Sequence, residues 1–275
     1  MKLNFTQEDD ITKLINSNDS IYHFTRKDIA IEYILNQKTL KLGSFSQTND
    51  PQEYRPRMTS AVGWGWEDRH LDKIHEITRA IDKIIKSSGF LSFCENIYDG
   101  SNLLGQGCLK SRMWSQYAEN HSGICLMFSK EKLLEEIEDQ LKQSSVIYKK
   151  LVTYKEPHRS RIKNSLALWG GEIDEQDKEE IAHKYIQSNY EHVFFQKQLD
   201  YKDENEFRIV SIPETGKYDN EIFLDISSSL KTIILGDAFP QVYLPTIKAL
   251  SKELNVPYRK LHWEKHSYRL LKWDK

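Results

Sequence analysis

Charged side chains recur at every second position in the segment Asp203-Glu204-Asn205-Glu206-Phe207-Arg208. In a strand, alternate side chains lie on the same face, so Glu204, Glu206 and Arg208 would lie together. One carboxylate could stabilise developing positive charge or bind a sugar hydroxyl while the other orients a nucleophile. The alternative is a solvated edge strand protected by its charges, which this segment taken alone favours.

A histidine and a hydroxyl have the same spacing in Tyr22-His23-Phe24-Thr25. The alternation over residues 21–25 predicts a strand with His23 and Thr25 on one face. A neutral imidazole both donates and accepts hydrogen bonds, so His23 could hold a sugar hydroxyl or an amide. A structural histidine at a strand end is the alternative, and a lone histidine favours it.

The central segment from Arg112 to Leu126 joins a short helix to a buried strand without a linker. The pattern predicts helical turns over 112–120, a tight turn at His121-Ser122-Gly123 in which Gly123 can take a positive φ, and a strand over 124–128. Trp114, Tyr117 and His121 are three and four residues apart, so they could meet at the mouth of that strand and form a stacking site. Equally, Trp114 and Tyr117 could pack the helix while His121 caps it.

Composition restricts the classes of function. The chain has 275 residues and a net charge of -2, which gives no general attraction to nucleic acid or anionic membrane. No membrane span or secretion signal is visible, so we expect a cytoplasmic protein with no membrane partner. The three cysteines form no C-x-x-C pair and no H-E-x-x-H motif occurs, so no metal site is expected. The oligomeric state is left open.

The elements that must position these residues are short strands with helices inserted irregularly. Helices are predicted at residues 26–36, 67–87, 130–143, 174–198 and 241–254. Strands are predicted at residues 21–25, 90–94, 124–128, 145–152, 206–210, 230–235 and 258–261. This mixture predicts an α+β fold with a mainly antiparallel, mixed, twisted sheet. We expect a single domain over residues 1–275, with its core at about 21–262.

In combination these segments resemble a bacterial family known as domain of unknown function twenty-nine seventy-one. The resemblance spans about residues 21–235 and rests on short sequence motifs in a fixed order. They are Tyr22-His23-Phe24, Asn49-Asp50-Pro51-Gln52-Glu53, Leu91-Ser92-Phe93-Cys94, Met113-Trp114-Ser115-Gln116-Tyr117-Ala118 with His121, Gly123 and Cys125, and Glu204-Asn205-Glu206-Phe207-Arg208-Ile209.

The opening Tyr-His-Phe-Thr before a helix also resembles the start of the ADP-ribosyltransferase superfamily. That resemblance implies a split sheet, NAD as substrate, a first-strand His, a central Tyr or Ser, and a late-strand Glu. It makes Glu206 catalytic, with Glu204 as the accessory acid of a Glu-x-Glu motif. The cofactor-binding residues it implies, with Tyr117 and Ser92 as rivals for the central position, are His23, Phe24, Thr25, Ser92, Trp114, Tyr117 and His121.

The resulting functional expectation is a bacterial NAD-using enzyme. It would transfer ADP-ribose to a nucleic-acid or protein acceptor, or hydrolyse NAD, and a toxin or phage-defence role would suit this chemistry. The alternative is a non-catalytic binding module, with nucleic acid as its candidate ligand. Its binding face would combine the Trp/Tyr/His cluster with the basic, aromatic stretch from Lys260 to Lys275.

Overall fold

The structure, a computed structural model, describes residues 10–48, 50, 53, 61–65, 67–156, 166–214, 218 and 221–272. Its helices are α1 (Asp10–Ile15), the π-helix η1 (Ile29–Leu35), η2 (Phe45–Gln47), α3 (Asp68–Ser87), η3 (Gly107–Leu109), α4 (Ser111–Tyr117), α5 (Lys130–Leu141), α6 (Gly170–Glu175), α7 (Lys178–Phe194), η5 (Leu199–Glu204), η6 (Gln241–Tyr243) and α8 (Leu244–Leu254).

The strands of the same residues are β1 (Ser20–Thr25), β2 (Thr39–Lys41), β3 (Gly43–Ser44), β4 (Ala61–Trp64), β5 (Gly89–Glu95), β6 (Ile97–Asp99), β7 (Asn102–Gly105), β8 (Ile124–Ser129), β9 (Ser145–Leu151), β10 (Thr153–Lys155), β11 (Leu166–Trp169), β12 (Gln196–Gln198), β13 (Glu206–Pro213), β14 (Phe223–Asp225), β15 (Leu230–Leu235), β16 (Tyr258–Glu264) and β17 (Ser267–Leu271).

One large sheet organises the described part of the chain. Its strand order is β17-β16-β15-β8-β1-β5-β13-β9, with β3 paired to β5 as a ninth strand. Every neighbouring pair is antiparallel except β15 and β16, which run parallel. The prediction of an α+β fold with a mainly antiparallel mixed sheet is therefore confirmed.

The sheet forks between β1 and β5. These strands pair only at Ile21↔Glu95 and Tyr22↔Cys94, whereas β1 pairs with β8 along its whole length from Ser20 to Thr25. Beyond Tyr22 the two strands separate, and the ring Nδ1 of His23 lies 3.1 Å from the Ser92 carbonyl oxygen across the gap. The fork opens the centre of the sheet at the level of the predicted site residues.

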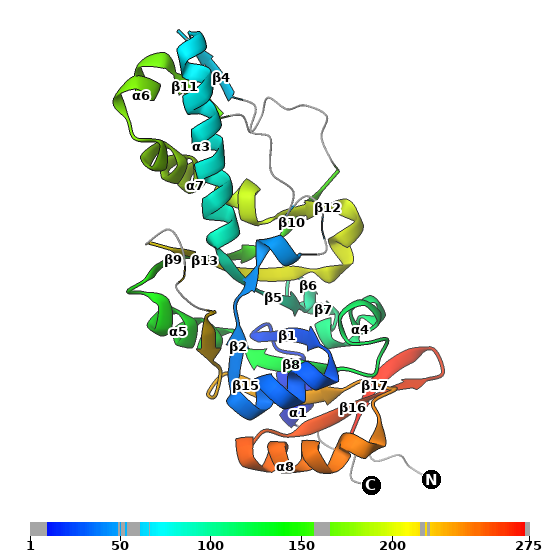
Figure 1. The fold of residues 1–275 in the computed structure, drawn as a ribbon. Helices are drawn as coiled ribbons and strands as arrows, with labels where there is room; N and C mark the ends of the chain where they lie inside the picture. Colours follow the sequence, from blue (N-terminus) through cyan, green and yellow to red (C-terminus); the bar gives the residue numbers. More distant parts are fainter. Residues whose placement is uncertain are drawn as a thin grey trace, which may run out of the picture.

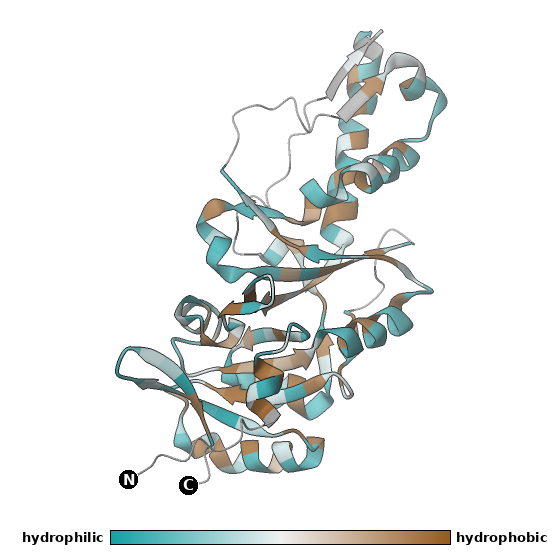
Figure 2. Ribbon diagram, turned by 180° about the vertical axis from the view of Figure 1, so that it is seen from behind, coloured by the Kyte–Doolittle hydropathy of each residue, from teal (hydrophilic) through white to brown (hydrophobic). Residues whose placement is uncertain are grey.

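Apolar side chains cover both faces of the sheet. On one face, α5, α8 and η1 pack against the strands through buried residues such as Leu133, Ile247 and Ala30. On the other, α4 packs through Trp114 and Met113 against Tyr22 and neighbouring residues. Figure 2 shows the hydrophobic residues gathered along the strands and the inner faces of these helices. Burial of this apolar surface is the main force that holds the sheet and helices together.

A second group of helices extends from the β9–β13 side of the sheet. Figure 1 shows α3 and α7 side by side, with β4, β11 and α6 at the far end of this lobe. The helix predicted at 67–87 is confirmed as α3, and its buried stripe includes Ile77, Ile81 and Ile84. Leu71, in the first turn of α3, is exposed. The lobe is thus a helix pair rooted beside β13.

The helix predicted at 174–198 is wrong in its limits. It divides into α6 and α7, and the chain leaves the helix after Phe194 to form β12. The strand β12 pairs in parallel with β10, Lys197 lying opposite Tyr154. Local periodicity does not reveal this change, because the pairing partner of β12 comes from a distant part of the chain. As a result, Lys197 is directed toward Glu206 of β13.

Candidate functional site

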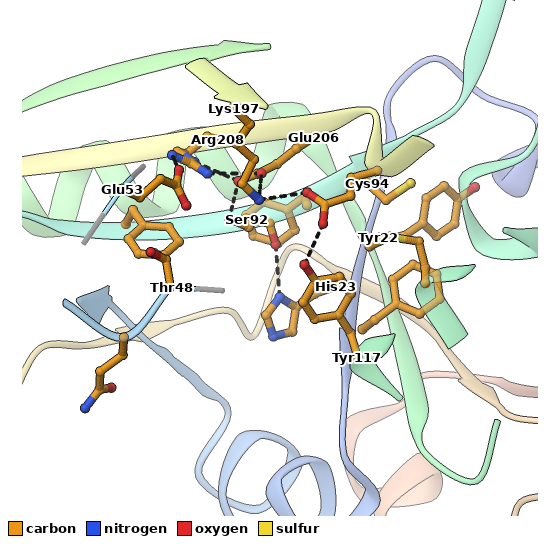
Figure 3. Close-up of a pocket in the computed structure, with 16 residues that line it drawn as sticks. Tyr22, His23, Thr48, Glu53, Ser92, Cys94, Tyr117, Lys197, Glu206 and Arg208 are labelled. Atoms are coloured by element: carbon orange, nitrogen blue, oxygen red, sulfur yellow. Dashed lines mark hydrogen bonds and ion pairs between the residues drawn. The ribbon is translucent and has the colours of Figure 1, made fainter. Parts of the chain in front are cut away.

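A cavity of about 200 Å³ lies at the fork of the sheet. Its walls come from the strands β1, β5, β12 and β13, the helix α4, and the segments around η2 and η5 (Figure 3). The residues that line it are Tyr22, His23, Phe24, Gln47, Thr48, Glu53, Phe90, Ser92, Phe93, Cys94, Met113, Tyr117, Lys197, Glu204, Glu206 and Arg208. An apolar wall thus surrounds a compact group of polar and charged side chains.

Glu206 is the most completely bonded of these groups. Its Oε1 accepts hydrogen bonds from the hydroxyl of Ser92 and from Nε of Arg208, the latter at 2.7 Å. Its Oε2 accepts from Nη2 of Arg208 at 3.1 Å and lies 2.8 Å from Nζ of Lys197. A carboxylate offers about four lone-pair positions, so these donors occupy all of them.

Burial and charge act in opposite directions on Glu206. Burial alone would raise the pKa of its carboxyl, but the adjacent Arg208 and Lys197 charges outweigh it and lower that pKa to about 2. The same carboxylate raises the pKa values of Lys197 and Arg208, against the effect of their burial. Glu206 is therefore an ionised carboxylate at neutral pH.

Lys197 joins the two acids of the Glu-x-Glu motif. Its Nζ lies 2.7 Å from Oε2 of Glu204 and 2.8 Å from Oε2 of Glu206. Glu204 does not belong to the strand, because it ends η5 and the left-handed Asn205 (φ 45°) separates it from β13. The two carboxylates meet through the shared ammonium rather than through the alternation of one strand, which corrects the predicted arrangement.

Tyr117 extends from α4 to the same group. Its hydroxyl donates to Oε1 of Glu204 at 2.5 Å. The helix is fixed beneath it by Trp114, which is fully buried and donates from its ring nitrogen to the Cys108 carbonyl at 2.7 Å. Of the two α4 residues predicted for the site, Tyr117 lines the cavity, while Trp114 packs edge-on against Phe24 outside the cavity lining.

His23 enters the cavity wall through the fork. Because a carbonyl can only accept, the contact of Nδ1 with the Ser92 carbonyl places the proton on Nδ1 and leaves Nε2 as an acceptor. Burial lowers the pKa of His23, which favours the neutral ring. No group in the described ranges bonds Nε2. His23, Ser92 and Glu206 are thus linked across three neighbouring strands, β1, β5 and β13 (Figure 3).

Glu53 is the remaining acid of the cavity. Its Oε1 accepts a hydrogen bond from Nη1 of Arg208, which also donates to the Phe194 carbonyl at 2.7 Å. Its Oε2 is buried and has no hydrogen-bond partner in the described structure. Burial raises the pKa of the Glu53 carboxyl even though Arg208 and Lys197 act to lower it. Glu53 is therefore the least stabilised anion of the group.

Besides Trp114, two more of the predicted binding residues lie outside the cavity lining. Thr25, the end of β1, is buried against β8 and does not line the cavity. His121 lies beyond α4, its ring packed against Tyr268 of β17 with 3.4 Å between Nε2 and the tyrosine oxygen. His121 is separated from Tyr117 because the left-handed turn after α4 carries the chain away from the fork.

That turn also differs from its prediction. The positive φ angles belong to Glu119 (48°), Asn120 (51°) and His121 (68°), whereas Gly123 has none. A side chain at Gly123 would place its Cβ 2.5 Å from the Thr25 carbonyl oxygen, so glycine is needed there for close approach. Three consecutive left-handed residues reverse the chain within one turn, and Lys27 holds the turn through a 2.8 Å bond to Glu119.

Three charged residues of the cavity were not predicted as site residues. Glu53 belongs to the motif Asn49-Asp50-Pro51-Gln52-Glu53, whose residue types also suit an ordinary turn. Arg208 was considered only as a neighbour of the two acids. Lys197 carries no local signal at all.

No group of three or more His, Cys, Asp or Glu within the described residues could hold a metal ion. Among those residues, too, no helix combines the length and apolar character needed to cross a membrane.

Comparison with known proteins gives one match. Residues 113–209 match the family described as "Protein of unknown function (DUF2971)". The matched segment holds six of the lining residues, and the others lie outside it: the six are Met113, Tyr117, Lys197, Glu204, Glu206 and Arg208. No curated protein and no solved structure matches the chain. The family description assigns no activity, so functional inference depends on the cavity.

Proposed function

We propose that the protein is an enzyme that cleaves the bond between nicotinamide and ribose in NAD. It either transfers ADP-ribose to a macromolecule or hydrolyses NAD. The observation that carries this proposal is the continuous contact His23–Ser92–Glu206 across three neighbouring strands, beside Tyr117 in one cavity. These are the residue types that the resemblance to ADP-ribosyltransferases implies for a first-strand His, a central Ser or Tyr, and a late-strand Glu.

The chemistry of these groups suits the reaction. Departure of nicotinamide leaves an oxocarbenium-like ribose, which a fixed carboxylate stabilises more than the ground state. Glu206 is ionised, desolvated and held by preorganised donors, which supports such a role. Because all its lone pairs are occupied, a ribose hydroxyl must replace one of the present donors. The hydroxyl of Ser92 is the donor that can rotate away without leaving a buried charge unpaired.

The size of the cavity limits which part of NAD it takes. Ligand pockets usually measure roughly 300–1,000 Å³, and this one measures about 200 Å³. We infer that the cavity holds the nicotinamide and its ribose, while the diphosphate and adenosine extend past Gln47 and Thr48 at its edge. The neutral His23 presents Nε2 as an acceptor for a hydroxyl or amide of the bound end.

The test is release of free nicotinamide from NAD by the purified protein, followed by chromatography with and without nucleic acid. Glu206→Gln should reduce the rate about 100-fold or more, the usual result of removing a preorganised electrostatic group. The matched control is Glu95→Gln, because Glu95 is a carboxylate of the same sheet that pairs with Lys130 at 2.7 Å outside the cavity. Absence of nicotinamide release with every acceptor tried, or equal rates in both variants, would contradict the proposal.

A second candidate function, nucleic-acid binding, is favoured by the hairpin of β16 and β17. Trp263 is 50% exposed there and packs edge-on against Tyr268 with ring centres 4.8 Å apart. Basic residues follow the same hairpin: Arg259, Lys260, Lys265, Arg269 and Lys272. An exposed aromatic ring among cations suits a single strand. Trp263→Ala should weaken binding of a single-stranded oligonucleotide about tenfold in fluorescence anisotropy, and unchanged affinity would exclude this surface.

A further inference from the structure

The charges of the described cavity residues do not balance. Among the described residues that line it, three carboxyls, Glu53, Glu204 and Glu206, face two permanent cations, Lys197 and Arg208. The neutral His23 adds no charge at ordinary pH. If every acid were ionised, the buried group would carry one excess negative charge. A desolvated excess charge is costly, so it must be neutralised by a proton or by a cation.

Glu53 is the acid whose negative charge is least balanced by donors. Glu206 has four donors and Glu204 has two, from Tyr117 and Lys197. Among the described residues, Glu53 has only the Arg208 contact at Oε1, and its Oε2 is buried without a partner there. Glu53 is only 5% exposed and lines the cavity, so its charge acts directly on any group bound there.

The groups around Glu53 support this assignment. Arg208 and Glu206 face it from β13 and Lys197 from β12, and the two cations are shared with the other acids. The nearby Asp50 accepts bonds from the backbone and side-chain amides of Gln198. Burial outweighs the two cations and raises the pKa of Glu53. Protonation of Glu53 leaves a neutral cavity.

We propose that Glu53 releases a proton when a cationic, ring-bearing group of the ligand enters the cavity and takes over the balancing of its charge. The inference rests on the proposed function, in which that group is the pyridinium ring of NAD. The proton leaves Oε2 for solvent, and no bond of the ligand forms or breaks. The aromatic wall of Phe24, Phe90, Phe93 and Tyr117 offers flat faces that favour a cationic ring.

Two small probe molecules distinguish the effect of ligand charge from the effect of ligand shape. 1-Methylnicotinamide carries the pyridinium charge, and nicotinamide is the neutral molecule with the same ring and carboxamide. Their binding to the full chain is measured by calorimetry across pH and in two buffers of different ionisation enthalpy. We expect the cation to bind more tightly, with release of about one proton and an affinity that rises about tenfold per pH unit while Glu53 is protonated. Nicotinamide should show neither effect.

The variant Glu53→Gln tests whether the released proton comes from Glu53. Its side-chain oxygen can still accept from Arg208, and its amide cannot ionise, so the cation should lose its pH dependence and its advantage over nicotinamide. Glu95→Gln, outside the cavity, should behave as the unaltered protein. If Glu53→Gln does not fold, the proton count of the unaltered protein in the two buffers decides.

Several results would overturn the inference: equal affinity for the two probes, no binding of either, no proton release, or a persisting pH-dependent preference in Glu53→Gln. These outcomes are separate from failure of the proposed function. Cleavage of NAD without proton release would leave the function standing and remove the role of Glu53. A cation preference that depends on Glu53, without any release of nicotinamide from NAD, would support the role of Glu53 and contradict the proposed function.

Discussion

Arg208 and Lys150 are opposite neighbours on adjacent strands, yet they occupy different environments. They are register partners of β13 and β9, and each pairs with a glutamate: Arg208 with Glu206 and Lys150 with Glu191. The side chains of Arg208 and Glu206 are 1% and 4% exposed, whereas those of Lys150 and Glu191 are 41% and 56% exposed. A buried ion pair and a solvent-exposed ion pair therefore lie on adjacent strands.

This difference shows that the number of ion pairs says little about what they do. In water the attraction between two charges is weak and salt screens it, but a buried charge that loses its partner cannot be resolvated. The buried pair therefore fixes the geometry of Glu206 and of the cavity. The exposed pair covers the edge strand β9 and contributes to solubility. The comparison can be tested by changing both members in the same way.

The largest effect is expected for Arg208→Met, which keeps a long side chain but removes the charge. Glu206 and Glu53 would both lose a buried partner, and the Phe194 carbonyl would lose its donor. We expect the free energy of unfolding to fall by about 3–5 kcal/mol, measured by urea denaturation. A change near zero would show that the network stabilises the cavity less than its burial indicates.

A smaller, pH-dependent effect is expected for Glu206→Gln. The pKa of Glu206 is lowered from 4.5 to about 2, so its contribution to stability is present above pH 4.5 and is lost as the pH falls toward 2. The variant should therefore show a flatter fall in stability between these pH values. Glu53 has the opposite sign, because its raised pKa gives a contribution that disappears as the pH rises. Parallel acid-unfolding curves for variant and parent would contradict this assignment.

The two sides of the comparison also explain what the sequence could predict. The strands around His23, Ser92, Glu206 and Arg208 follow from local alternation, as does the helix that presents Tyr117, because each pattern lies within one element. Nothing local distinguishes Arg208 from Lys150, since both are basic residues of strands that alternate. Their environments are set by which segments cover them, and those segments come from distant parts of the chain.

The same reason accounts for the residues that were missed or misplaced. Lys197 reaches the acids only because β12 leaves α7 and pairs with β10. Glu53 reaches Arg208 across more than 150 residues of sequence. Trp114 and His121 have suitable spacing from Tyr117, but spacing on a helix does not state which face meets the sheet. The fork between β1 and β5 is likewise a property of pairing, not of either strand.

An intermediate effect is expected for Tyr117→Phe. The change removes one donor to Glu204, whose other partner Lys197 remains, so the free energy of unfolding should fall by roughly 1–2 kcal/mol. Tyr33→Phe is the matched control, because the Tyr33 side chain is 50% exposed and the same hydroxyl is lost to solvent. Equal losses in the two variants would show that the Tyr117–Glu204 bond adds no stability, and would separate Tyr117 from the network.

The smallest effect is expected for Lys150→Met, the direct counterpart of Arg208→Met. Its partner Glu191 is solvated without it, because half of the glutamate side chain already faces water. The change should therefore leave the urea midpoint unaltered within measurement error, and 1 M salt should not separate variant from parent. Salt should also leave the loss in Arg208→Met in place, since a buried pair is screened little. If Lys150→Met proved as damaging as Arg208→Met, burial would not be what distinguishes the two strands. The cavity charges would then have to be treated as ordinary surface charges.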